Sequence, residues 1–180
     1  ASALMERFGK DVGVNLPVRD MNVLALQSWL LGLQARDVKY VTVMSGDHPA
    51  QGSYPGEKRV DSINALELIE CIQRHLNQGR FFPQLTPLSA SSSRFLSEEE
   101  FLDRATDLRP GAILIPKRAG ELERTKLKIE AGAKFFQTQI TYDHAPVLEF
   151  LAELEGQGYE SHVFVTFGPV TLAGLGVALP

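Results

Sequence analysis

The sequence predicts an α/β fold of the (βα)8 barrel (TIM-barrel) type, incomplete in this chain, on three observations. Short apolar stretches alternate with helical stretches along most of the 180 residues, which is typical of parallel βα units. No predicted strand runs into a G-x-G-x-x-G turn, which disfavours a dinucleotide-binding Rossmann fold. We recognise five strands, whereas a complete barrel has eight strands and usually about 250 residues. We therefore expect a single barrel domain over residues 1–180 that lacks some of its βα units.

In the first half of the chain, the spacing of apolar residues indicates helices and strands in turn. Gly9 ends the first helical stretch, since glycine commonly closes a helix in the left-handed conformation. Asp20 or Asn22 is placed to cap the second helix, and Asp61 with Ser62 to cap the third. The predicted elements are a helix over 1–8, a strand over 12–17, a helix over 23–36, a strand over 38–44 and a helix over 63–77.

The second half repeats the alternation after a stretch, 80–111, whose structure the pattern leaves uncertain. This stretch has a serine-rich centre typical of an exposed loop. Ser97 and Glu100 form a capping-box pattern in it, which predicts a helix that ends at about Asp107. Asp143 is placed to cap the last helix. The predicted elements are a strand over 111–116, a helix over 120–131, a strand over 134–139, a helix over 145–154 and a strand over 162–167.

Composition and charge exclude several classes of function. The chain is 44% hydrophobic and 22% charged, as in an ordinary globular domain. Its net charge of −4 provides no basic surface for nucleic acid, and no stretch approaches the ~18 apolar residues of a membrane span. The single cysteine, Cys71, makes no internal disulfide and no cysteine-rich metal site. We expect a cytoplasmic protein without a metal site.

The strongest candidate for a functional site lies where the predicted strand 38–44 ends. It runs into the sequence SGDHP at residues 45–49, so a carboxylate and an imidazole follow its carboxyl end. Ligands of parallel α/β folds bind at that end. The following loop, to Arg59, is long and rich in glycine and proline, which is typical of functional or mobile loops. Spacing alone gives equal weight to the alternative that Asp47 only caps the turn and His48 is solvated.

Three stretches carry motifs, each at a predicted strand end or just before one. Residues 19–32 contain RDMN, ALQS and LG, and residues 45–62 contain SGDHP and VDS. Residues 121–143 contain EL, KLK, AGA, FQTQ and a final aspartate. In this order they resemble the patterns RDxNxxALQSxLLG, TGDxP…DxDS and ELxRLKxKxxAGAxFxxTQxxxD of the methylenetetrahydrofolate reductase family. The resemblance covers about residues 12–75 and 112–170.

The resemblance implies a (βα)8 barrel that holds FAD at the carboxyl ends of its strands. It implies a flavoprotein oxidoreductase of one-carbon metabolism and methionine biosynthesis. The implied reaction reduces 5,10-methylenetetrahydrofolate to 5-methyltetrahydrofolate, with hydride passing through the flavin. The electron donor implied by the resemblance is NAD(P)H or a reduced electron-carrier protein. We also expect a homo-oligomer.

Carried over residue by residue, the resemblance places the family's essential aspartate on Asp47, as the catalytic residue. The substrate-contacting glutamine falls on Gln139, whose amide can donate and accept hydrogen bonds at a pterin edge. The flavin-binding lysine falls on Lys128, as a cation toward the FAD phosphates. The pattern alone leaves open that Lys128 belongs, with Arg124 and Lys126, to a solvated helix face. The implied cofactor-binding residues are Asn15, Met44, Ser45, Gly46, Asp47, Lys58, Arg59 and Lys128.

The chain departs from the family at several of these positions. Lys58 and Arg59 stand where the family usually has an aromatic residue over the flavin, and Asn15 stands where it often has histidine. The family's first two strands, which carry its catalytic glutamate, have no counterpart in the chain. Two alternatives follow: a flavin-independent relative that uses NAD(P)H directly, and a non-catalytic folate-binding subunit of the same fold.

Overall fold

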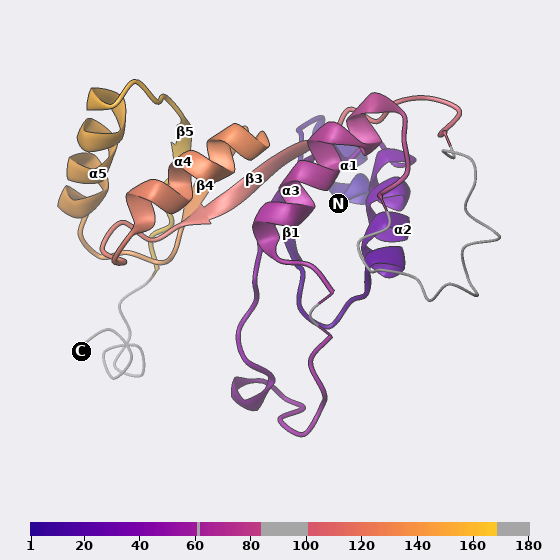
Figure 1. The fold of residues 1–180 in the computed structure, drawn as a ribbon, viewed down its shortest axis with the longest axis horizontal. Helices are drawn as coiled ribbons and strands as arrows, with labels where there is room; N and C mark the ends of the chain where they lie inside the picture. The colour runs from indigo at the N-terminus through magenta and orange to yellow at the C-terminus, as the bar shows by residue number, and fades with distance from the viewer. Residues whose placement is uncertain (61, 84–100, 169–180) are drawn as a thin grey trace.

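Five parallel strands form the central sheet of the computed structural model, which describes residues 1–60, 62–83 and 101–168 (Figure 1). Each strand pairs with the next one along the chain, so the sheet order is β1-β2-β3-β4-β5. The sequence of β2, YVTVM, is rich in the β-branched and aromatic residues that favour strands. The strands are β1 (Gly13–Pro17), β2 (Tyr40–Met44), β3 (Arg109–Leu114), β4 (Phe135–Thr138) and β5 (His162–Phe164).

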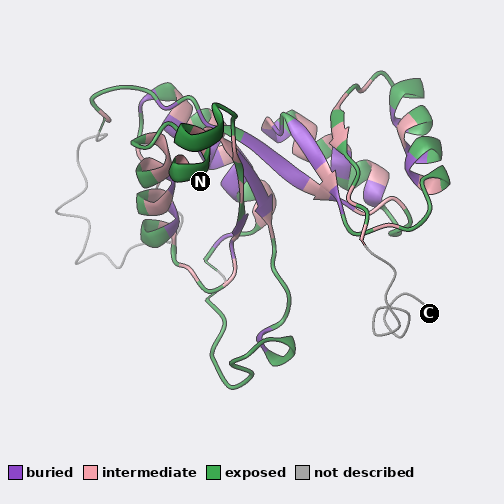
Figure 2. Cartoon of the chain, turned by 180° about the vertical axis from the view of Figure 1, so that it is seen from behind, coloured by how far each residue is buried: buried purple, intermediate pink, exposed green. Residues whose placement is uncertain are grey.

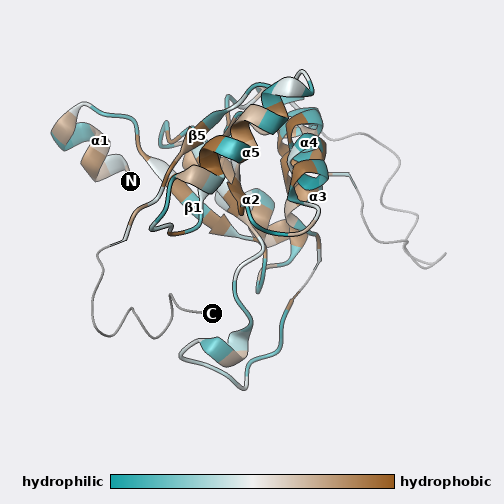
Figure 3. Cartoon of the chain, turned by 90° about the vertical axis from the view of Figure 1, so that its left-hand side faces the viewer, coloured by the Kyte–Doolittle hydropathy of each residue, from teal (hydrophilic) through white to brown (hydrophobic). Residues whose placement is uncertain are grey.

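Helices connect the successive strands, as in a βα barrel. A Rossmann sheet would reverse its strand order in the middle, whereas this sheet keeps the order of the chain. The predicted barrel-type fold, with five strands where a complete barrel has eight, is confirmed. The first helix precedes the sheet and projects from the rest of the fold (Figure 3), with none of its residues buried. The helices are α1 (Ser2–Phe8), α2 (Val23–Gln34), α3 (Ala65–Arg74), α4 (Glu121–Ala131) and α5 (Ala145–Gly156).

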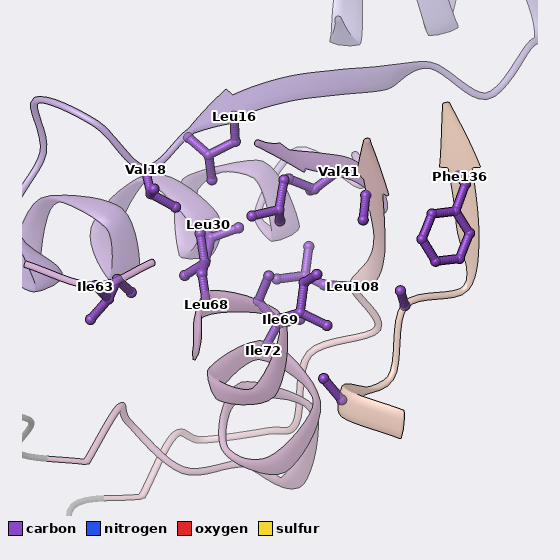
Figure 4. Packing of buried hydrophobic residues seen from close by; sticks show 14 of the residues in the cluster. Leu16, Val18, Leu30, Val41, Ile63, Leu68, Ile69, Ile72, Leu108 and Phe136 are labelled. Carbon is purple, nitrogen blue, oxygen red and sulfur yellow. The ribbon is translucent and has the colours of Figure 1, made fainter. Parts of the chain in front are cut away.

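One face of the sheet packs against the helices and forms the hydrophobic core (Figure 4). Successive residues of a strand point to opposite faces, and the residues of one parity, such as Val41 and Val43, are the ones in this core. They meet Leu30 of α2 and Ile69 and Ile72 of α3, all of which are buried. Because the helices cover the same face of the sheet, its opposite face points to the interior of the barrel.

The residues of the other parity line the inner face of the sheet. Asn15, Thr42, Gly111, Phe135 and His162 are register partners and form one row across the five strands. A β-carbon at Gly111 would overlap the ring of Phe135, so the ring lies across β3 at that point. The middle strand β3 is buried along most of its length (Figure 2).

Helix α3 begins later than predicted. Its N-cap is Asn64, whose Oδ1 accepts from the backbone N–H groups of Leu66 and Glu67 at 2.9 and 3.0 Å. The Glu67 carboxylate accepts in turn from the Asn64 backbone N–H at 2.7 Å. The prediction that Asp61 and Ser62 cap this helix was wrong, because Asn64 and Glu67 form a complete capping box three residues apart. Asp61 itself lies outside the described residues.

The predicted helix that ends at Asp107 is absent from its described part, residues 101–107. Its Ser97–Glu100 start lies outside the described residues. Residues 101–108 instead run beside the 3-10 turn η2 (Leu76–Gln78). Asn77 fixes them there, since its side chain accepts from Thr106 Oγ1 at 2.6 Å and from Leu108 N at 3.1 Å. This bonding to a distant side chain leaves no local signal in the sequence.

Several ends also differ from the prediction. The helix predicted to end at 77 stops at Arg74 before η2, and β5 ends at Phe164 instead of 167, with Phe167 in an isolated bridge to Thr141. Asn22, one of two expected caps, is the N-cap of α2, where its Oδ1 accepts from Ala25 N at 2.9 Å.

None of the helices in the described ranges is long and apolar enough to cross a bilayer.

Candidate functional site

A pocket of about 600 Å³ lies at the carboxyl ends of β2 and β3. The loop after β2, the start of α3, the inner side of α4 and the residue after β4 form its walls. It is therefore on the side of the sheet where parallel βα folds bind ligands. The pocket brings together six predicted site residues that are far apart in the sequence: Met44, Ser45, Gly46, Asp47, Lys128 and Gln139.

The other three predicted cofactor residues do not line this pocket. Asn15 lies on the inner face of β1, beside Thr42, and is exposed. Lys58 and Arg59 lie on the returning half of the loop after β2, where every residue from 50 to 60 is exposed. Their predicted role in cofactor binding stays a prediction.

The turn that carries Asp47 depends on a glycine. Gly46 has a φ of +78°, in the left-handed region that glycine adopts without strain. A β-carbon there would also lie only 3.1 Å from Cβ of Pro17. Asp47 and His48 are both exposed, but the His48 ring is used locally, since its Nδ1 accepts from Ala50 N at 3.2 Å. His48 therefore caps the short 3-10 turn η1 (Pro49–Gln51).

A buried carboxylate organises the other wall of the pocket. The Glu121 side chain is 1% exposed, and its Oε1 accepts from Ile115 N at 3.1 Å. Its Oε2 accepts from Arg118 Nε at 2.6 Å and also contacts Nη2 of the same guanidinium. Lys128 Nζ lies 3.6 Å from Oε1 and donates to the Ile113 carbonyl at 2.7 Å. Glu121 thus ties the first turn of α4 to the end of β3 and to both cations.

Lys128 is not part of a solvated helix face. Its side chain is only 14% exposed, and burial lowers the pKa of its ammonium from the ordinary value. Glu121 opposes that shift, and the nearby Arg118 and Arg124 reinforce it. Arg124 also lines the pocket, with its Nη1 donating to the Ala119 carbonyl at 2.8 Å.

Sequence reasoning missed Glu121, Arg118 and Arg124 as parts of the site. The spacing offered a signal, because residues seven apart, such as Glu121 and Lys128, lie on the same side of a helix. Three cations and two carboxylates, those of Glu121 and Asp47, leave a net positive charge in this part of the pocket. The arrangement suits an anionic group, which the arginines can bind through paired N–H donors.

Gln139 completes the pocket from the fourth strand, β4. It follows the end of β4, where its backbone N–H donates to the Leu114 carbonyl at 3.2 Å, and it is exposed. The start of α3 also lines the pocket, but Asn64 and Glu67 already satisfy its first amides. An anion in this pocket therefore depends on the three cations instead of the helix end.

A second cavity, of about 670 Å³, lies at the amino-terminal ends of the strands, around Tyr40, Arg109, Phe135 and His162. In βα barrels that end serves stability, whereas catalytic residues lie at the carboxyl ends. Its three rings, Tyr40, Phe135 and Phe164, pack edge to face with centroids 6.1 and 5.7 Å apart. Within residues 1–60, 62–83 and 101–168, no group of three or more histidine, cysteine or acidic side chains is placed to hold a metal ion.

The family model described as methylenetetrahydrofolate reductase matches residues 1–174. The chain belongs to this family. Its members have a TIM-barrel fold, in agreement with the parallel sheet described above. Membership supports a folate-related function in an oxidoreductase family.

No curated protein matches the chain. Among solved structures, one similar protein comes from Clostridium thermocellum and is described as uncharacterized and as binding two copies of 5-methyl-5,6,7,8-tetrahydrofolic acid. The two chains are 14% identical, the TM-score is 0.35, and the match covers 94% of this chain and 72% of that one. A likeness at this level carries no argument about function.

Proposed function

We propose that the protein is an FAD-dependent oxidoreductase that reduces 5,10-methylenetetrahydrofolate to 5-methyltetrahydrofolate, in one-carbon metabolism toward methionine. One observation carries the proposal in a chain of this family. A carboxylate, an amide and three cations, contributed by three separate βα units, line one pocket at the carboxyl ends of the strands. We propose NAD(P)H or a reduced electron-carrier protein as the electron donor, and a homo-oligomer as the assembly.

The donor set of the pocket fits FAD, which members of the family commonly bind. Arg118, Arg124 and Lys128 would hold the diphosphate, because guanidinium and ammonium groups bind phosphate oxygens. The backbone around Gly46, which has no side chain to obstruct a flat ring, would lie along the flavin. When bound, FAD supplies the transfer of hydride. The protein contributes its binding, its orientation and the charges around it.

Asp47 supports the proposal through its charge. Reduction of the methylene group requires the cationic iminium form of the folate, and a nearby carboxylate stabilises a developing positive charge. The side chain is exposed to the pocket at the mouth of the turn. In this role Asp47 acts through its charge and forms no covalent bond to the substrate.

Gln139 orients the substrate in the same proposal. Its amide offers one acceptor oxygen and two donor hydrogens, which matches the alternating donors and acceptors of a pterin edge. Because it follows β4 while Asp47 follows β2, the two side chains would contact the folate from different sides.

A non-catalytic folate-binding role is the second candidate. The sheet in the described residues motivates it, since it has five strands where a complete barrel has eight. A flavin-independent relative, with hydride passing directly from NAD(P)H, is the third. Asn15, Lys58 and Arg59 motivate that alternative, because they depart from the flavin-binding pattern that the resemblance implies.

The test is an absorption spectrum of the purified protein after incubation with FAD and removal of the excess. We expect flavin bands near the usual ~450 nm, bleached by anaerobic reduction and restored by 5,10-methylenetetrahydrofolate. Gln139→Leu should weaken folate-dependent reoxidation without loss of flavin, while Gln78→Leu, a glutamine outside the pocket, should behave as wild type. A colourless protein that oxidises NAD(P)H with folate would favour direct transfer, and folate binding without turnover would favour the binding role.

A further inference from the structure

The loop that carries Asp47 leaves the sheet at the end of β2 and returns beside the turn that follows β1. It spans residues 45–60 and extends away from the sheet (Figure 1). All of its residues except Pro49 are exposed. Its own backbone hydrogen bonds are local, such as Gln51 N to His48 O at 2.9 Å and Glu57 N to Tyr54 O at 3.2 Å. With so little packing of its own, the loop depends on its two ends for its position.

Both ends are held by the turn that follows β1. Val18 N donates to the Met44 carbonyl at 2.9 Å, just before the loop leaves the sheet. Asp20 N donates to the Val60 carbonyl at 3.1 Å, where the loop returns. Two residues of one turn therefore fix two points that are sixteen residues apart in the sequence. Arg19, between them, packs against the outgoing end, with its Cβ 3.4 Å from the position of a β-carbon on Gly46.

This turn has an unusual conformation. Asp20 has a φ of +70°, in the left-handed region that residues other than glycine rarely adopt. Its Oδ2 forms an ion pair with the buried Nε of Arg19 at 2.6 Å. The pair joins Arg19, which lies beside Gly46, to Asp20, whose backbone N–H donates to Val60. Non-glycine residues in this conformation concentrate at functional sites, where the surrounding structure maintains them.

We infer that Arg19 and Asp20 are positioning residues for Asp47, which clamp both ends of the loop 45–60 and so fix the carboxylate at the pocket. The inference rests on the proposed function for its effect on turnover. The clamp itself, which is the structural part of the inference, does not depend on the proposed function. Arg19 and Asp20 touch neither substrate nor cofactor in this account, and they act through the backbone of Gly46 and Val60.

The clamp is tested first by limited trypsin digestion under native conditions, which needs no ligand. In Asp20→Ala and Arg19→Met, we expect cleavage after Lys58 or Arg59 to become about tenfold faster, since proteolysis follows the population of the open loop. Asp20→Asn keeps a residue that tolerates positive φ and removes only the ion pair, so it should give a smaller increase even if Asp20→Ala folds poorly.

Asp37 offers a matched control. It also has a positive φ, +58°, and an ion pair, 3.8 Å from Lys39, but its side chain is 77% exposed and lies at the entrance to β2. Asp37→Ala and Asp37→Asn should leave loop cleavage unchanged. Equal acceleration in the Asp37 and Asp20 variants, or cleavage that rises equally throughout the chain, would overturn the inference.

The second test measures folate-dependent reoxidation of the reduced flavin. We expect kcat to fall about ten- to a hundredfold in Asp20→Ala and Arg19→Met, because a displacement near 1 Å can cost that much, while flavin content and KM for the folate stay unchanged. In an Asp47→Asn background the same substitutions should cause no further loss. Additive losses would overturn the inference. If wild type shows no folate-dependent turnover, the proposed function fails, and the digestion result still decides the clamp.

Discussion

The buried carboxylate of Glu121 gives the sharpest test of how the pocket is built. Glu121→Gln keeps the size of the side chain and an acceptor for Ile115 N, but removes the charge that faces Arg118 and Lys128. Breaking a buried ion pair in this way costs about 3–5 kcal/mol, because the partner charge remains without compensation. Arg118 is 40% exposed, so water compensates much of its share. We therefore expect a loss of about 2–4 kcal/mol, mainly from the buried Lys128.

The assay is equilibrium unfolding in urea at neutral pH, read as the change in midpoint at constant slope. Glu123→Gln is the control on the same helix, since Glu123 is 72% exposed and pairs with Lys126 at 2.7 Å. Lys126 is 16% exposed, but the Glu123 carboxylate itself is solvated, so its loss should cost about 0–1 kcal/mol. If Glu121→Gln and Glu123→Gln lowered the free energy of unfolding by the same small amount, the account of Glu121 as the organising charge would be refuted.

Three further predictions concern single residues. Burial lowers the pKa of Lys128 below 10.5, so between the lowered pKa and 10.5 the unfolded chain binds more protons than the folded one. The stability of wild type relative to Lys128→Met should therefore rise as pH increases toward 10.5. A flat difference in urea midpoints across alkaline pH would contradict this. Burial raises the pKa of the Cys71 thiol to about 11, so a thiol reagent at pH 8 should modify it only after denaturant is added, and rapid modification of the native protein would show that the thiol is accessible. Gly111→Ala should cost about 1–3 kcal/mol in the same urea assay, because its β-carbon would overlap the Phe135 ring. Gly13→Ala is the control, since its β-carbon would only touch Tyr40 at 3.7 Å, and it should cost less than half as much.

Most of the fold follows from local pattern. Short β-branched runs such as β2, and helices closed by Gly9 or Gly132 in the left-handed conformation, are visible in the sequence because their causes are local. The prediction failed for residues 101–107, before β3, because the contacts that fix them come from a distant part of the chain. There the side chain of Asn77 supplies the hydrogen bonds of residues about thirty positions later, and the helix predicted from a local capping pattern is absent from residues 101–107.

The site residues also divide into those that the sequence predicts and those that depend on distant packing. Asp47 and Gln139 follow strand ends, and the parallel arrangement of β2 and β4 brings strand ends together, so their placement on one pocket follows from the topology. Glu121 was missed because the spacing that places it on the same side of α4 as Lys128 does not show that it is buried against the end of β3. Lys58 was assigned from the resemblance alone, without a geometric reason, and it lies outside the pocket.

The most direct test of the central claim is the rate at which 5,10-methylenetetrahydrofolate reoxidises the reduced, FAD-loaded protein, followed at ~450 nm without oxygen. The account predicts reoxidation that depends on the folate in wild type and falls at least about a hundredfold in Asp47→Asn, with flavin still bound. Reoxidation at the same rate in both proteins would contradict the role of Asp47, and failure of wild type to bind flavin or respond to the folate would contradict the function proposed for the pocket.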